Sequence, residues 1–265
     1  MSLRPPSPPP GWYEDPWRLA PDRWWDGQAW SSHVRTAPAA PPPTIPIEAG
    51  VWGLIAITAV MVVLHVGAGL VAPHLPVVAG VVLVTLALYG PMTAYCVYAS
   101  RRWATGRLSV DLGARIRLVD LPIGVLAVFA ALQLERIVAA ILDVLDVPIT
   151  SNVTDVTDNR ALYVTLAAVA VVAAPVVEEL FFRGLLLSAL RSRLSAVPAV
   201  AIQAVVFGAY HAAPVYGWGN VGLVVVLSVV GAVFGATAQL TRRLGAGMVA
   251  HALLNAVVFV VLLVT

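Results

Sequence analysis

The sequence has no lysine and few charged residues of any kind. Its 16 basic residues are all arginine, and charged residues make up 11% of the 265 positions, against about a quarter in soluble domains. With 60% apolar residues and a mean hydropathy of +0.87, the composition is that of a membrane protein. The formal net charge of +2 is too small to indicate nucleic acid as a partner.

Cysteine is almost absent as well. The single one, Cys96, excludes an internal disulfide. It lies within an apolar run, where we expect a buried and inert thiol. The chain also lacks an H-E-x-x-H sequence, which excludes the zinc site that this helical motif builds.

Prolines and tryptophans gather in the first fifty residues, which hold twelve of the 20 prolines and five of the eight tryptophans. Proline tracts form extended linkers, so we expect a disordered tail over 1–10 and a linker over 37–50. The Trp-rich stretch between them, 11–36, is too short for a normal core. We expect a small module rich in β-turns, with the DG pair as a hairpin turn and a docking or folding role.

Residues 51–265 alternate apolar segments with short polar breaks. Because a helix needs about 20 apolar residues to span a bilayer, the pattern predicts an all-α transmembrane bundle of about seven spans. An eighth helix could lie in 100–120, although that stretch looks more like an amphipathic segment at the interface. The expected spans are 51–72, 77–99, 121–142, 161–189, the short 198–213, 220–240 and 246–264.

The arginines sort to alternate breaks. Thirteen of the 16 lie in 1–50, 100–120, 190–197 and 241–244, whereas the connection 143–160 carries four aspartates and one arginine. Loops rich in arginine stay in the cytoplasm. We therefore expect a multi-pass protein of the cell membrane whose N-terminus is cytoplasmic, with a possible cytosolic partner for the Trp-rich module.

An ionisable residue inside a membrane helix is costly and is a functional candidate for that reason. The stretch AAPVVEELFFRGLLLSAL, residues 173–190, holds three of them. Glu179 and Arg183 are four residues apart, share a helix face and can form an ion pair. Glu178 is rotated by about 100° and lacks such a partner, which suits a general base. Pro175 frees a backbone carbonyl and predicts a kink beside the site.

Two further clusters repeat the four-residue step. FGAYHAA places Phe207 and His211 on one helix face, and HALLNAV places His251 and Asn255 on another. Imidazoles move protons, and an Asn amide can donate a hydrogen bond to an oxyanion.

Depth in the membrane allows the clusters to meet. Glu178 and His211 lie 16 and 17 residues on either side of Leu194, where two antiparallel helices would join, and His251 follows Arg243 by eight residues. We expect them to surround one pocket that holds water. Because Glu178 lies late in its span, an opening toward the cytoplasm is expected.

The succession of EELFFRG, FGAYH and HALLN resembles the CPBP family of intramembrane proteases, which includes CAAX proteases and the bacteriocin-processing, Abi-type enzymes. Its motifs E-E-x-x-x-R, F-x-x-x-H and H-x-x-x-N all match, and the resemblance covers about 120–265. It implies an endopeptidase that hydrolyses a peptide or protein substrate in the lipid bilayer. Residues 11–36 resemble a short Trp-rich domain of unknown function found in bacterial membrane proteins.

The resemblance also implies roles for the motif residues. Glu178 and His211 would activate the attacking water, and His251 and Asn255 would bind the oxyanion. Glu179, Arg183 and Phe207 would support the site.

The sequence leaves open whether a cofactor is bound. Asn is a poor zinc ligand and a good amide donor, which favours metal-free, glutamate-dependent catalysis over a metalloprotease. If a metal is present, Glu178, His211 and His251 would supply a zinc site of two nitrogens and one oxygen.

Other functions are alternatives. A proton-coupled transporter would use the same ionisable residues as a relay, although the chain shows no convincing internal repeat. A non-catalytic membrane scaffold would bind partners through the Trp-rich module. Glu135 and Arg136 lack a partner at i,i+4, and a structural or access role is expected for them. The sequence decides neither the substrate, nor whether it is prenylated, nor the oligomeric state.

Overall fold

The computed structural model describes residues 8–35, 44–150 and 156–264. The chain divides into two compact units, Met1–Pro42 and Pro43–Thr265, which are described separately. Most of the tail expected over 1–10 and half of the linker expected over 37–50 lie outside the described residues.

The N-terminal unit contains a three-stranded antiparallel sheet in the order β1-β2-β3. Its strands are β1 (Gly11–Glu14), β2 (Asp22–Trp25) and β3 (Trp30–Arg35). The turn between β2 and β3 contains the DG pair, as expected, and Gly27 adopts a φ of 99° there, which favours glycine. Tryptophan rings pack across the strands, with Trp25 and Trp30 5.2 Å apart.

A buried carboxylate organises the first loop of this sheet. Asp15 is 1% exposed and accepts hydrogen bonds from the backbone amides of Trp17, Leu19 and Ala20. The hydrogen-bonded ion pair with Arg23, at 3.0 Å, lowers the pKa of Asp15 although burial opposes the shift. Polar contacts thus support a unit too small to bury a large core.

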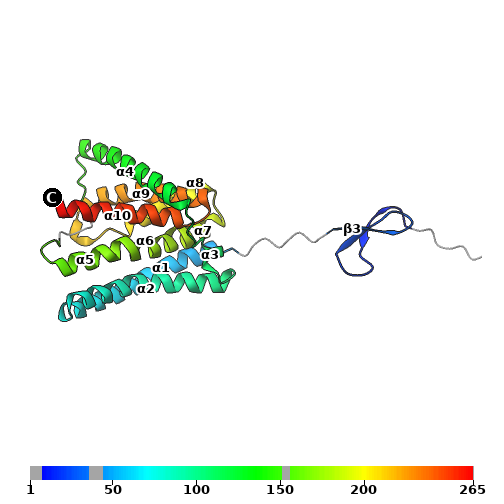
Figure 1. Ribbon diagram of the computed structural model, residues 1–265, viewed down its shortest axis with the longest axis horizontal. Coiled ribbons are helices and arrows are strands. Elements are labelled where there is room, and N and C mark those ends of the chain that lie inside the picture. Colours follow the sequence, from blue (N-terminus) through cyan, green and yellow to red (C-terminus); the bar gives the residue numbers. More distant parts are fainter. Residues whose placement is uncertain (1–7, 36–43, 151–155, 265) are drawn as a thin grey trace, which may run out of the picture. The chain divides into compact units, whose positions relative to one another are not determined.

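The second unit is a helical bundle (Figure 1). Within the described residues, six helices are long and apolar enough to span a membrane. They are Ile47–His74, which joins α1 (Ile47–Val71) to η1 (Ala72–His74), α2 (Val77–Trp103), α4 (Asp120–Val144), the helix Arg160–Arg191, α9 (Gly219–Thr241) and α10 (Gly245–Val264).

The remaining elements are short. The segment expected at 198–213 forms α8 (Ala196–Ala209), whose 14 residues are too few to span alone, and η4 (Pro214–Tyr216) follows it. Residues 100–120 form no spanning helix; they contain the end of α2, the four-residue α3 (Leu108–Asp111) and the start of α4. The transmembrane helical fold expected from the sequence is confirmed.

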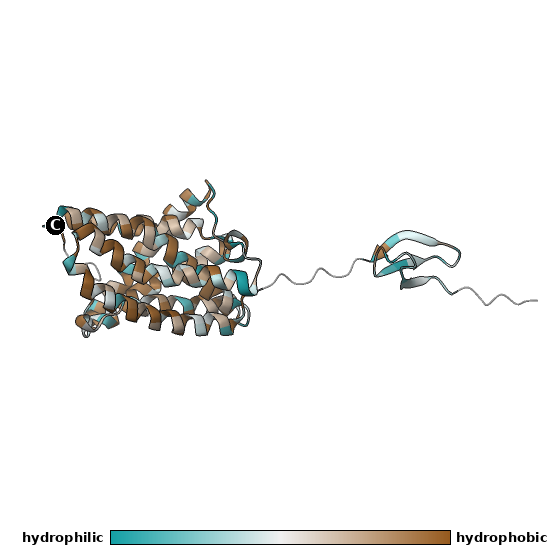
Figure 2. Ribbon diagram, turned by 90° about the horizontal axis from the view of Figure 1, so that it is seen from below, coloured by the Kyte–Doolittle hydropathy of each residue, from teal (hydrophilic) through white to brown (hydrophobic). Residues whose placement is uncertain are grey.

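The outer surface of the bundle is suited to lipid. Large apolar side chains such as Trp52, Leu70 and Phe129 are exposed on α1 and α4, where an aqueous surface would carry few contiguous ones. Apolar residues predominate along the bundle in Figure 2, and hydrophilic residues gather near its ends.

The arginine-rich breaks meet at one end of the bundle. Glu48 at the start of α1 lies 3.9 Å from Arg193, which follows α7. Arg243 pairs at 2.6 Å with Asp120 at the start of α4. The shared end agrees with the sorting of arginines in the sequence, and its cytoplasmic location stays a prediction.

The helix Arg160–Arg191 changes register twice. It runs through α5 (Arg160–Ala168), the π-helix η2 (Val169–Ala173), α6 (Ala174–Glu178), the π-helix η3 (Glu179–Leu186) and α7 (Leu187–Arg191). In η2 the amide of Ala174 donates to the carbonyl of Val169, and Pro175 has no amide to offer. The carbonyl of Ala170 is therefore left without a helical donor.

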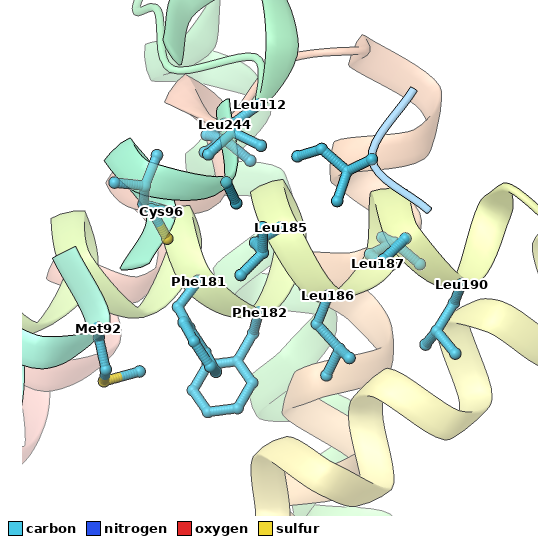
Figure 3. Packing of buried hydrophobic residues seen from close by; sticks show 14 of the residues in the cluster. Met92, Cys96, Leu112, Phe181, Phe182, Leu185, Leu186, Leu187, Leu190 and Leu244 are labelled. Carbon is cyan, nitrogen blue, oxygen red and sulfur yellow. The ribbon is translucent and has the colours of Figure 1, made fainter. Parts of the chain in front are cut away.

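The second π-helix is fixed in the core. Phe181, Phe182 and Leu185 are at most 1% exposed, and Figure 3 shows them beside Met92 and Cys96 of α2. Cys96 is fully buried, as expected. This packing holds the polar residues of η3 in place.

Candidate active site

Glu178 ends α6 and lines a cavity of about 960 Å³. Its Oε1 accepts a hydrogen bond of 2.8 Å from the Tyr89 hydroxyl on α2. Its Oε2 lies 3.9 Å from Nε2 of His211 and 3.8 Å from Nε2 of His251, and accepts no hydrogen bond from the described residues. The acid and both imidazoles singled out in the sequence therefore converge.

The spacing of these atoms suits a shared water molecule. A separation of 3.9 Å between Glu178 Oε2 and His211 Nε2 is too long for a direct hydrogen bond. A water that donates to two acceptors at about 2.8 Å each bridges roughly 4 to 4.5 Å. One water can thus give a hydrogen to each group.

His211 is oriented by the end of α8. Its Nδ1 lies 2.9 Å from the carbonyl oxygen of Phe207, which can only accept, so the network assigns the proton to Nδ1. Its Nε2 is then an acceptor directed at Glu178. The ring also packs edge-on against the Phe207 ring, with 4.8 Å between centroids, so the predicted sharing of one face is confirmed.

His251 lies between the two glutamates. Its Nδ1 is 3.3 Å from Glu179 Oε1, and its Nε2 faces Glu178. The same Glu179 oxygen is 3.1 Å from Nη1 of Arg183, which confirms the ion pair predicted from the four-residue spacing. Each ring nitrogen of His251 thus faces a carboxylate oxygen.

Arg183 is 2% exposed and packs between Glu179 and two aromatic rings. Its guanidinium lies over the ring of Phe207 at 4.1 Å and over Phe234 at 5.6 Å. Its Nη2 donates to the Gly231 carbonyl at 3.4 Å. The ion pair and the aromatic faces together offset the cost of burying the charge, and Phe207 supports both Arg183 and His211.

The close packing around Glu179 requires a glycine on α10. A Cβ at Gly247 would lie 2.6 Å from Glu179 Oε2, closer than van der Waals contact allows. Gly247 therefore lets α10 bring His251 up to the carboxylate.

Asn255 lies one turn beyond His251 and lines the same cavity. Its Nδ2 donates a hydrogen bond of 2.6 Å to the carbonyl of Ala170, the group that η2 leaves without a helical donor. The carbonyl that Pro175 was expected to free is thus used to hold this amide. The second hydrogen of Nδ2 stays available to the cavity.

The rest of the cavity lies away from the arginine-rich end. Within the described ranges, its lining includes Ile149, Thr150 and Val156 from the aspartate-rich connection and no residue of the arginine-rich breaks. This arrangement points away from the cytoplasmic opening expected from the late position of Glu178 in its span.

Tyr89 was not predicted from the sequence. It lies outside the three motifs, and a tyrosine in an apolar helix commonly packs at a helix interface. Its contact with Glu178 comes from α2, a helix that carries no motif residue.

The separations between the site atoms are longer than those of ligands around a tetrahedral zinc ion. Tetrahedral zinc ligands about 2.0 to 2.1 Å from the metal lie roughly 3.3 to 3.4 Å from one another. Glu178 Oε2 is 3.8 and 3.9 Å from the two imidazole nitrogens. Among the described residues, no group of three or more His, Cys, Asp or Glu is arranged to hold a metal ion.

Comparison with known families adds the identity of this region. Residues 160–257 match the family described as Type II CAAX prenyl endopeptidase Rce1-like. This part of the chain is therefore similar to that family. The match confirms the resemblance drawn from the three motifs, and with the apolar helices it supports a multi-pass intramembrane endopeptidase. The matched residues 160–257 include all the predicted site residues, whereas Tyr89 and Glu135 lie outside them.

The N-terminal unit has its own match. Residues 10–43 match a family described as a protein of unknown function, DUF2510, in agreement with the resemblance noted for 11–36. No curated protein and no solved structure matches the chain.

Proposed function

We propose that the protein is a metal-free, glutamate-dependent endopeptidase of the CAAX-protease or bacteriocin-processing type. The observation that carries this proposal is the unpaired Oε2 of Glu178, which lies within 3.9 Å of both imidazole Nε2 atoms in the region similar to the Rce1-like family. A buried carboxylate with a free oxygen beside two imidazoles is equipped to accept a proton from water.

The reaction begins with a water molecule held between Glu178 and His211. Glu178 takes one proton as the water oxygen attacks the carbonyl carbon of the peptide bond, and His211 Nε2 holds the other hydrogen. The carbonyl oxygen becomes an oxyanion. An Nε2–H of His251 and the free Nδ2 hydrogen of Asn255 donate to it. Glu178 then returns its proton to the leaving nitrogen, the C–N bond breaks, and an acid and an amine are released.

Three residues keep this arrangement in place. Glu179 orients His251 through Nδ1, Arg183 compensates the charge of Glu179, and Phe207 bonds His211 through its carbonyl. None of them reaches the water between Glu178 and His211, so they act through the residues that do.

The arginine distribution supports a cytoplasmic N-terminus in the cell membrane. We propose that the Trp-rich unit lies on that side and docks a cytosolic partner there. The peptide or protein substrate reaches the cavity within the bilayer.

The test compares the wild type with Glu178→Gln as full chains in lipid vesicles, with a peptide library derived from a bacterial proteome as substrate. New peptide ends should appear with the wild type and fall by about 10²- to 10⁴-fold with the variant. Glu48 is an exposed glutamate at the arginine-rich end of the bundle and does not line the cavity. Glu48→Gln is therefore the matched control and should cleave normally. Equal cleavage by Glu178→Gln would refute the proposal.

Metal dependence is tested on the same vesicles. Cleavage should persist after dialysis against a strong chelator. Activity that disappears on chelation and returns with zinc alone would contradict the metal-free mechanism.

A further inference from the structure

A second carboxylate lines the cavity far from any motif. Glu135 lies on α4 (Asp120–Val144), is half-buried, and borders the same cavity as Glu178. Glu178 faces His211 and His251 across 3.9 and 3.8 Å. Glu135 forms no hydrogen bond or ion pair with them within the described residues. Among the carboxylates and imidazoles that line the cavity in the described part of the chain, Glu135 is the one that the proposed reaction does not use.

A carboxylate at this position needs a physical reason. Placing one near the middle of a membrane helix costs about 2.5 to 3.5 kcal/mol on insertion scales. The adjacent Arg136 is exposed and is rotated by about 100° on the helix, so the two side chains do not share a face. Arg136 interacts with Glu135 electrostatically, but it does not line the cavity, whereas Glu135 does.

The surroundings of Glu135 restrict what it can bind. Most other lining residues are apolar, such as Leu88, Ile149 and Leu223, and a poorly hydrated carboxylate attracts cations and repels anions strongly. Ligand pockets commonly measure about 300 to 1,000 Å³. The cavity, at about 960 Å³, is thus large enough for more than one residue of a peptide. A peptide bound at Glu178 therefore has room to place a neighbouring side chain at Glu135.

We infer that Glu135 binds a basic side chain, arginine or lysine, of the peptide substrate and selects cleavage sites with a cation at a fixed position from the cut bond. This inference rests on the proposed endopeptidase function. Because α4 lies outside the matched residues 160–257, the selectivity belongs to this chain's own helix and not to the shared motifs. Acidic side chains at the same position are excluded by like charge.

The test maps cleavage sites in the same proteome-derived peptide library with the full chain in vesicles. Only cuts that vanish with Glu178→Gln are counted. The wild type should enrich arginine and lysine at one position, Glu135→Gln should lose that enrichment, and Glu135→Arg should favour aspartate and glutamate there. Arg136→Gln, the matched control on the exposed face, should keep the wild-type profile.

A pair of synthetic peptides then measures the effect. One strongly cut sequence is made with arginine at the selected position and again with citrulline, which keeps the shape and removes the charge. The wild type should show a KM about tenfold lower for arginine, as expected for one partly desolvated ion pair of about 1.4 kcal/mol. Glu135→Gln should reduce this ratio to near one, whereas Arg136→Gln should keep it.

The outcomes separate the two proposals. An unchanged arginine preference in Glu135→Gln, or cuts that depend on Glu178 and show no basic position, overturns the inference and leaves the endopeptidase standing. Absence of any cleavage that depends on Glu178 overturns both. Size-exclusion profiles check that each variant folds. If Glu135→Arg does not fold, the cleavage profile of Glu135→Gln alone tests the inference.

Discussion

Glu178 and Glu179 are neighbours on one helix and have opposite surroundings. Each has one oxygen that accepts no hydrogen bond from the described residues, but Glu178 borders the cavity, whereas Glu179 is fully buried between Arg183 and His251. One step of about 100° around the helix axis separates these faces. The comparison shows that surroundings decide which carboxylate is free to exchange a proton and which one holds charged neighbours in the fold.

The largest effect is expected from removing the carboxylate on the packed face. Glu179→Ala leaves Arg183 buried without its ion pair and should destabilise the protein by about 3 to 5 kcal/mol. Thermal unfolding in detergent, followed by size exclusion, measures the loss. Glu178→Ala is the matched control and should unfold near the wild-type temperature while losing activity.

A double variant sharpens this comparison. Combining Glu179→Ala with Arg183→Met removes both charges and should recover part of the lost stability, because the cost lies in the unpaired arginine. If Glu179→Ala alone is as stable as the wild type, the packed face does not depend on this ion pair.

The second prediction concerns the amide on the cavity face. Asn255→Ala removes a proposed oxyanion donor, and kcat should fall by about 10²- to 10³-fold. It also leaves the Ala170 carbonyl without a donor, so stability should drop by about 1 to 3 kcal/mol. Rate measurements under conditions where both proteins are folded separate the two effects. A variant that is less stable but cleaves at the wild-type rate would assign Asn255 to the helix alone.

Tyr89 tests how the cavity-face carboxylate is aimed. Tyr89→Phe removes the hydroxyl that bonds Glu178 Oε1, so the free Oε2 should be held less firmly. We expect kcat to fall by about tenfold, the equivalent of one hydrogen bond to a charged group, with little change in KM. Tyr98→Phe, an exposed tyrosine on the same helix, should leave both constants unchanged. A rise in KM at constant kcat would instead place Tyr89 in substrate binding.

The polar centre could be predicted because charge within an apolar span is conspicuous. The four-residue spacing gave the Glu179–Arg183 pair and the Phe207–His211 contact, both of which depend on local helix geometry. Counting residues from Leu194 placed Glu178 and His211 at similar depth, and the structure brings them within 3.9 Å.

The rest depends on packing that spacing does not encode. The π register of η2 shifts the backbone hydrogen bonds by one residue and leaves the Ala170 carbonyl free to bond Asn255. Tyr89 reaches Glu178 from a helix 89 positions away in sequence. The position of Glu178 along its helix indicates its depth in the membrane. It does not indicate toward which end of the bundle the cavity extends, because the neighbouring helices decide that.

The smallest effect is expected from a carboxylate–arginine pair outside the membrane. Arg23 lowers the pKa of Asp15 in the folded N-terminal unit, whereas the unfolded value is about 3.9. The pair therefore stabilises this unit above about pH 4 and stops doing so as the pH falls through the folded pKa. Asp15→Asn should remove this dependence and increase cleavage of the unit by an added protease at pH 7.

The same variant shows how far the two units depend on each other. Peptidase activity of the full chain should stay within about twofold of the wild type, because surface changes far from a site are usually close to neutral. Glu14→Gln, an exposed neighbour on β1, is the control for protease sensitivity. If Asp15→Asn resists the protease as well as the wild type, the pair does not stabilise the sheet. If it abolishes peptidase activity, the small unit acts directly on the membrane site, and a charge pair in water then matters as much as the one between Glu179 and Arg183.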